Sequence, residues 1–328
     1  MTIGAQPTSR EKHLSETMFS SSKLAPSAAR DLRAIGMDSD WFPHVALVRG
    51  VSRPKSEKCR DSNGHLLRRL GSRVPVLSVG GFHPARTPSE LRRATELGLG
   101  LSFNLPHGFD IHALDAVLPH VQWIHIGSAV SLTGWGALRS LINAESITLG
   151  ATPRGALGLE GMVHLRQFEG RGASSVTVAE NPNLSELDLN ASTWPPSIQI
   201  AGKLNFLTLT GNRQLAAMPP IRHPQSVREL TLGGMARFDL ATIAALRNLR
   251  KVRILSTGEL SNSSTLGSLP RLKEVILHNV RQVTDWPSLM NLSLTSMHLS
   301  KNRFIPPPEV EVLRNRPGWQ LEDYRPEG

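Results

Sequence analysis

The chain has 328 residues, of which 39% are hydrophobic and 20% charged, and its formal net charge is +10. This composition is typical of a globular protein with a sizeable core. No run approaches 18 consecutive apolar residues, which excludes a membrane-spanning helix. Cys59 is the single cysteine, so no intrachain disulfide can form.

The first residues, MTIGAQPTSREKH, are polar and lack the apolar core of a secretory signal. Together with the lone cysteine, they favour a protein of the reducing cytoplasm. Export as an effector, by a route that needs no cleaved signal, is the alternative. The usage of Ala, Arg and Pro is typical of a GC-rich bacterial genome.

The positive charge is concentrated near the N-terminus. Residues 1–96 hold 16 basic and 9 acidic residues, whereas residues 97–328 hold 21 and 18. Eight basic residues lie between residues 49 and 73: Arg49, Arg53, Lys55, Lys58, Arg60, Arg68, Arg69 and Arg73. We interpret them as a solvated loop and helix face, because no aromatic residues are interleaved. A site for nucleic acid or another anionic surface is the alternative.

We expect residues 1–25 to be disordered and residues 26–96 to form an N-terminal capping region around this basic loop. Within the cap, the patterns predict helices over 27–35 and 87–98 and strands over 44–50 and 74–81. The helix over 87–98 begins with a capping residue, Thr87, followed by Pro88 and by Glu90 three residues on.

An apolar–variable–apolar pattern recurs nine times beyond residue 97. Its second apolar position falls on Ile126, Leu149, Gly170, Leu189, Leu209, Leu232, Ile254, Leu277 and Leu299. The steps between these positions are 19–23 residues. Because side chains alternate along a strand, each pair points into a shared core and the variable residue points outward. One unit cannot cover its own apolar face, so neighbouring units must stack.

This pattern resembles the leucine-rich repeat family, whose unit runs L-x-x-L-x-L-x-x-N, with the asparagine at Asn104, Asn212 and Asn302. The resemblance implies an α/β solenoid, a horseshoe with a parallel concave β-sheet and short helices or extended segments on the convex side. It places repeats over 97–303 and a C-terminal cap over 304–328. In the cap, we expect a helix from Pro308 to Leu313 and a last strand over 318–324.

On the convex side, apolar residues at helical spacing predict short helices over 110–121, 239–249 and 264–272. Leu240, Ile243, Ala244 and Leu246 form the expected buried face of the second helix. The segments 174–184 and 194–200 alternate with a period of two, which predicts extended structure instead.

Motifs for catalysis or metal binding are weak. Cys59 and Asp61 form a Cys-x-Asp that resembles the nucleophile setting of leucine-rich bacterial ubiquitin ligases, which gives an enzymatic alternative. We expect no counterpart of the separate helical ligase module of those enzymes after the repeats. His107 and His112, like His120 and His125, are five residues apart, which is not a zinc spacing. Gly80 and Gly81 lack the lysine of a phosphate loop. We expect no enzyme activity, cofactor or metal.

The outward residues of the repeats form the candidate binding face on the concave sheet. Those that we expect to contact a partner are Trp123, His125, Glu169, Arg171, Glu186, Asp188, Phe206, Thr208, Glu229, Lys251, Arg253, Glu274, His278 and His298. Solvated sheet residues without a ligand are the alternative. The acidic centre repels phosphates and so disfavours nucleic acid on this face, whereas exposed aromatic residues are typical of protein interfaces.

These observations predict a non-enzymatic protein that binds another protein carrying a basic patch. Neutralisation of a toxin by covering it and the role of a host-directed effector are both compatible with the sequence. The oligomeric state has no sequence signature here.

Overall fold

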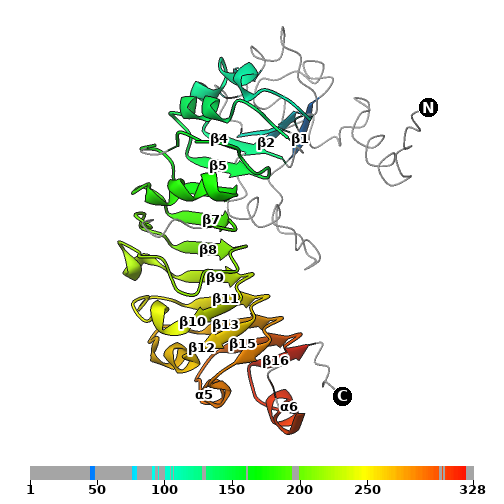
Figure 1. The fold of residues 1–328 in the computed structure, drawn as a ribbon, viewed down its shortest axis with the longest axis vertical. Helices are drawn as coiled ribbons and strands as arrows, with labels where there is room; N and C mark the ends of the chain where they lie inside the picture. The colour runs from blue at the N-terminus through cyan, green and yellow to red at the C-terminus, as the bar shows by residue number, and fades with distance from the viewer. Residues whose placement is uncertain are drawn as a thin grey trace, which may run out of the picture. The chain divides into compact units, whose positions relative to one another are not determined.

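Short parallel strands separated by helical turns dominate the computed structural model of the chain (Figure 1). The structure describes strands 45–48 and 76–79, helical residues 91, 92 and 95, and residues 100–322 except 104, 106, 128–130, 160, 161, 194–198, 303, 304 and 306. The chain divides into two compact units, Met1–Ala151 (unit 1) and Thr152–Gly328 (unit 2).

The described residues of unit 1 form the strands β1 (Val45–Val48), β2 (Val76–Val79), β3 (Gly100–Phe103), β4 (Trp123–Ile126) and β5 (Ser146–Leu149). β1 pairs antiparallel with β2, and the pairs from β2 to β5 are parallel. In the described residues, the 3₁₀ helices η3 (Ile111–Leu114) and η4 (Leu118–His120) lie between β3 and β4, and η5 (Trp135–Ser140) lies between β4 and β5. The predicted strands over 44–50 and 74–81 are therefore confirmed.

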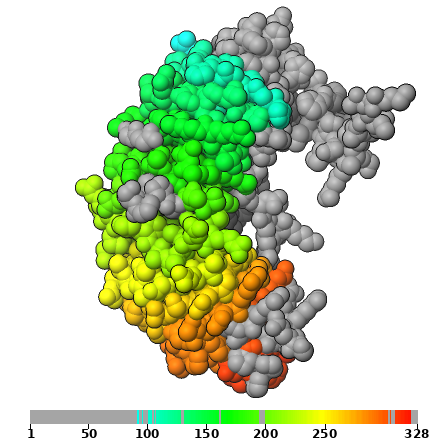
Figure 2. Space-filling view, in the orientation of Figure 1, coloured from blue at the N-terminus to red at the C-terminus, as the bar shows by residue number. Residues whose placement is uncertain are grey.

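Unit 2 contains a parallel sheet in the order β6 (Gln167–Arg171), β7 (Glu186–Asn190), β8 (Phe206–Thr210), β9 (Glu229–Gly233), β11 (Lys251–Leu255), β13 (Glu274–His278), β15 (Ser296–Ser300) and β16 (Trp319–Glu322). A second parallel sheet is formed by β10 (Arg237–Asp239), β12 (Glu259–Ser261) and β14 (Gln282–Val283). The helical segments are η6 (Ala173–Glu180), η7 (Pro224–Ser226), η8 (Leu240–Ile243), η9 (Ser263–Ser268), α5 (Trp286–Met290) and α6 (Pro307–Arg314). In Figure 2, the repeats of this unit follow one another in chain order, from green to orange.

The core of unit 2 lies on one face of its sheet. The second and fourth residues of the main-sheet strands β7, β8, β9, β11, β13 and β15 are at most 1% exposed. Burial of one such aliphatic side chain stabilises the fold by about 1.5–3 kcal/mol. The strand register aligns these residues, as in the row Leu209–Leu232–Ile254. The repeat spacing, the parallel register and the buried pairs together confirm the leucine-rich repeat fold.

Gly170 occupies a core position where the other repeats carry a large apolar residue. A Cβ atom at Gly170 would lie 2.5 Å from the Phe168 ring and 2.7 Å from the Ser175 Oγ atom. The Phe168 ring therefore fills the space that a leucine takes elsewhere, which explains why the apolar pair is degenerate in this repeat.

Polar side chains join neighbouring repeats where the strands end. Buried Asn302 accepts a hydrogen bond from the Val280 N–H (2.9 Å) and donates one to the Leu277 carbonyl (2.8 Å). Asp285 accepts hydrogen bonds from the N–H groups of Ser263 (2.8 Å) and Ser264 (3.0 Å). Burial raises the pKa of Asp285, but these bonds, with the Ser263 and Ser288 hydroxyls, outweigh it and lower the pKa.

The predicted helices between strands are confirmed as short 3₁₀ turns. Leu240, Ile243 and Leu246 are buried around η8, and Ala244 is half-buried. The prediction of an extended segment at Val176 and Val178 is wrong, because η6 covers both residues. The buried residues of η6 are Ser175, Val176, Val178 and Ala179. They fall three apart in pairs, as a 3₁₀ helix requires. The two pairs, Ser175 with Val178 and Val176 with Ala179, overlap in sequence. Their overlap places the buried Val176 and Val178 two residues apart, which imitates the alternation of a strand.

In the other segment with a period of two, Ile200 bridges in parallel to Ile221, as extended structure does. The C-terminal elements are confirmed as α6, which begins one residue earlier than predicted, and β16. The Trp286 Nε1 atom donates a hydrogen bond from α5 to Glu309 on α6.

Several predictions fall outside the described residues. They are the disorder of 1–25, the helix over 27–35, the basic loop with Cys59, the Gly80–Gly81 pair and most of the helix over 87–98. The predicted domain boundaries at residues 25, 96 and 303 also stay predictions. In the part of the chain that is described, no helix is long and apolar enough to cross a membrane.

Candidate protein-binding surface

The outward face of unit 2 lies opposite the core of the main sheet. It consists of the side chains at the first, third and fifth positions of β6, β7, β8, β9, β11, β13 and β15, and at the second and fourth positions of β16. Parallel register arranges them in rows. The first positions form the row Gln167–Glu186–Phe206–Glu229–Lys251–Glu274–Ser296. The third positions form Glu169–Asp188–Thr208–Thr231–Arg253–Ile276–His298, and the row continues to Gln320, the second residue of β16. Neighbours in a row are about 4.8 Å apart, the spacing of hydrogen-bonded strands.

Carboxylates gather at the β6–β9 end of this face. Glu169 lies directly opposite Asp188, and Glu186 lies opposite Phe206. Glu229 is the next residue in the same row as Phe206. An aromatic ring is therefore flanked by a carboxylate on each side. Like charges at this spacing repel one another, so the cluster attracts cations.

Some outward residues are less open than the sequence predicts. Glu169 and Thr208 are 7% and 6% exposed, respectively, although solvent exposure was expected. Both are the central residue of a five-residue strand, flanked by the outward residues of their own strand and by Asp188 in a paired strand. Phe206, like Glu186, Asp188 and Glu229, is half-buried. Their part in partner binding stays a prediction.

The β11–β15 end of the face is mixed in charge. The Lys251 ammonium forms an ion pair and hydrogen bond with Glu274 in the neighbouring strand. The His278 Nδ1 atom shares a hydrogen bond with the Ser300 hydroxyl (2.7 Å). Arg253 and His298 lie on either side of Ile276 in the third-position row. Arg171, at the fifth position of β6, is opposite Asn190.

Two predicted contact residues, Trp123 and His125, belong to unit 1. Trp123 is half-buried and lies opposite Ser146, and His125 lies between Ser102 and Thr148. The His125 Nδ1 atom shares a hydrogen bond with the Ser102 hydroxyl (2.8 Å), and burial lowers the pKa of His125. Ser146 and Thr148 occupy outward positions of β5, before and between its two inward residues Ile147 and Leu149, yet each is only 1% exposed.

The weak motifs find no support as metal sites. Within the described ranges, no three His, Cys, Asp or Glu side chains come together to hold a metal ion. His112 instead shares a hydrogen bond with Asp115 (3.1 Å), and His107 shares one with Ser131 (3.3 Å). Cys59 and the basic residues 49–73 lie outside the described part of the chain.

No protein-family model matches the chain, and no curated protein sequence matches it either. The chain is similar to the crystal structure of an internalin (inlF) from Listeria monocytogenes, with 16% sequence identity and a TM-score of 0.48. The similarity covers 77% of this chain and 87% of that chain.

Proposed function

We propose that this leucine-rich repeat protein binds another protein through the outward face of unit 2 and acts without catalysis. The observation that supports the proposal most directly is the row Glu186–Phe206–Glu229. Asp188 is the next outward residue after Glu186 on β7. Carboxylates around an aromatic ring fit an arginine or lysine side chain, which stacks on the ring while its charge meets the carboxylates.

The partner is a protein with a basic surface patch. The acidic cluster steers such a partner and discriminates against acidic ones. The adjacent Lys251–Glu274 pair, which is internally neutral, forms the border of the cluster. Binding would act by covering the partner's surface, as in neutralisation of a toxin, or by delivering it, as in an effector. We place the protein in the cytoplasm of a bacterium.

The test of this surface is a double charge reversal. Glu186→Lys with Asp188→Lys is expected to weaken binding of the partner at least tenfold, because two attractive contacts become repulsive. The partner is first recovered by affinity purification from the native host, and its affinity is then measured by calorimetry.

The matched control is Glu180→Lys with Glu311→Lys. Both residues lie on helical segments away from the outward face, and the net charge changes equally. We expect this control to retain the affinity of the unmodified protein. An unchanged affinity in the Glu186/Asp188 variant contradicts the proposed surface.

A further inference from the structure

A row of cations lies at the N-terminal ends of three adjacent strands, beside the outward face. Arg228, Arg250 and Lys273 immediately precede β9, β11 and β13, and all three are exposed. The Arg250 N–H donates to the Arg228 carbonyl (2.8 Å), and the Lys273 N–H donates to the Arg250 carbonyl (2.9 Å). These bonds hold the three residues, the basic row, at strand spacing of about 4.8 Å.

Carboxylates are missing from the segments that lead into the row. Residues 221–228, 244–250 and 266–273 contain no aspartate or glutamate, and they add three further exposed cations, Arg222, Arg247 and Arg271. Among the described residues, none of these six cations takes part in an ion pair. Like charges at adjacent strand positions are destabilising, so the row costs stability until an anion lies across it.

Cations on adjacent strands occur at this position only in the basic row. The equivalent positions before β7, β8 and β15 are Ser185, Asn205 and Thr295, and the exposed Arg166 before β6 is separated from the row by β7 and β8. The basic row also differs from other exposed arginines of unit 2. Arg237, for example, lies opposite Glu259 in the second sheet.

We infer that the basic row is a docking site for the sugar–phosphate backbone of double-stranded nucleic acid. Five of the six cations are arginines, whose planar forks match phosphate oxygens. No Phe, Tyr or Trp lies in the three segments, so stacking on single-stranded bases has no large aromatic platform. Exposed large apolar residues, such as Ile142, Val163 and Val312, lie elsewhere among the described residues. The strip thus lacks the apolar anchors of protein hot spots and membrane-binding faces.

Phosphates are confined to this edge, because the first outward position beyond Arg228 is Glu229 and the acidic cluster follows. The docking site is therefore separate from the proposed protein-binding surface, and its test does not depend on that proposal.

The test measures binding of the full-length protein to a fluorescently labelled DNA duplex of mixed sequence, between about 50 and 200 mM salt. Each phosphate contact contributes a slope of about −0.9 to the dependence of log K on log salt. The variant Arg228→Gln/Arg250→Gln/Lys273→Gln is expected to lose about 2.7 of that slope and at least tenfold in affinity at the lowest salt.

The matched control is Arg213→Gln/Arg237→Gln/Arg281→Gln, which removes the same charge from exposed sites in unit 2 away from the row. We expect this control to change the slope of log K against log salt by less than about 1 relative to the unmodified protein. Arg250→Gln alone, with an expected loss of about 0.9, serves if the triple variant is unstable.

Three results would overturn the inference. One is a salt slope that the row variant and the control change equally, since net charge alone then explains binding. Another is no loss of duplex binding in the row variant. The third is displacement of the duplex by polyglutamate or by phosphatidylserine vesicles at equal charge concentration, which would assign the row to an acidic protein or a membrane.

Discussion

Asn302 shows how one side chain ties two repeats together. Its amide is buried, and it satisfies one backbone N–H and one backbone carbonyl of the preceding repeat. Asn212 occupies the equivalent position of its repeat. Its side-chain oxygen accepts a hydrogen bond from the Gln214 N–H (2.8 Å), within the same turn. A residue without an amide leaves buried polar groups unpaired, and their desolvation is not compensated.

The variant Asn302→Ala is therefore expected to lower the free energy of unfolding by about 2–3 kcal/mol, because the Val280 N–H and the Leu277 carbonyl lose their partner. Urea unfolding followed by circular dichroism measures the change. Asn190→Ala, at the exposed end of β7, is the control and should cost less than about 0.5 kcal/mol. An equal decrease in the free energy of unfolding in both variants would mean that the two backbone hydrogen bonds of Asn302 stabilise the fold no more than an exposed asparagine does.

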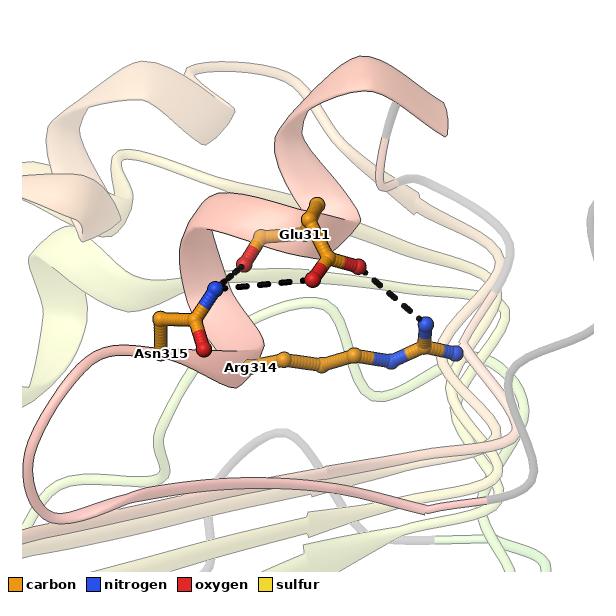
Figure 3. A network of polar contacts seen from close by, with 3 residues as sticks. All are labelled: Glu311, Arg314 and Asn315. Carbon is orange, nitrogen blue, oxygen red and sulfur yellow. Dashed lines mark hydrogen bonds and ion pairs between the residues drawn. The ribbon is translucent and has the colours of Figure 1, made fainter.

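At the C-terminal end of unit 2, helix α6 and strand β16 together form the last repeat. The Arg316 guanidinium donates hydrogen bonds to the Met290 and Leu292 carbonyls and lies over the Trp319 ring, 4.3 Å from its centre. Arg314 is in a different setting on the surface of α6, where it pairs with Glu311 beside Asn315 (Figure 3). The two arginines differ in their burial and in their acceptors, not in their chemistry.

We predict that Arg316→Ala lowers the free energy of unfolding by about 1.5–3 kcal/mol, since bonds to backbone carbonyls from a charged donor are lost together with the ring contact. Arg314→Ala should cost less than about 0.5 kcal/mol, because its ion pair is solvent-exposed. Thermal unfolding of both variants gives the comparison. A larger loss in Arg314→Ala would contradict the role assigned to Arg316.

At the scale of the whole molecule, each repeat of unit 2 is stabilised by its contacts with the repeats before and after it. Each strand of the main sheet pairs with the strands of the adjacent repeats and with no others. In such an array, stability is approximately a sum of repeat terms and nearest-neighbour terms, so damage stays local before it becomes global.

Leu232→Ala in β9 should accordingly cost about 2–5 kcal/mol and lower the amide hydrogen-exchange protection of β8, β9 and β11 more than that of β15 and β16. Leu299→Ala in β15 should produce the opposite distribution. Protection lost uniformly across unit 2 in both variants would show that the unit unfolds only as a whole.

The sequence by itself determined the repeat. The spacing of 19–23 residues and the paired apolar positions predicted the parallel sheet, its inward residues and its short convex helices, because burial of an alternating strand imposes that pattern on the residues. Exceptions arose where another side chain supplies the volume, as Phe168 does for Gly170, or where a 3₁₀ helix imitates alternation, as at Val176 and Val178.

Only the tertiary structure decided which outward residues are neighbours and how open they are. Register between strands places Phe206 between Glu186 and Glu229, and it stacks Arg228, Arg250 and Lys273, which lie more than 20 residues apart in sequence. Burial of Glu169, Ser146 and Thr148 also has no local signature. Outward positions carry no alternation constraint of their own, so their surroundings are set by residues from other repeats.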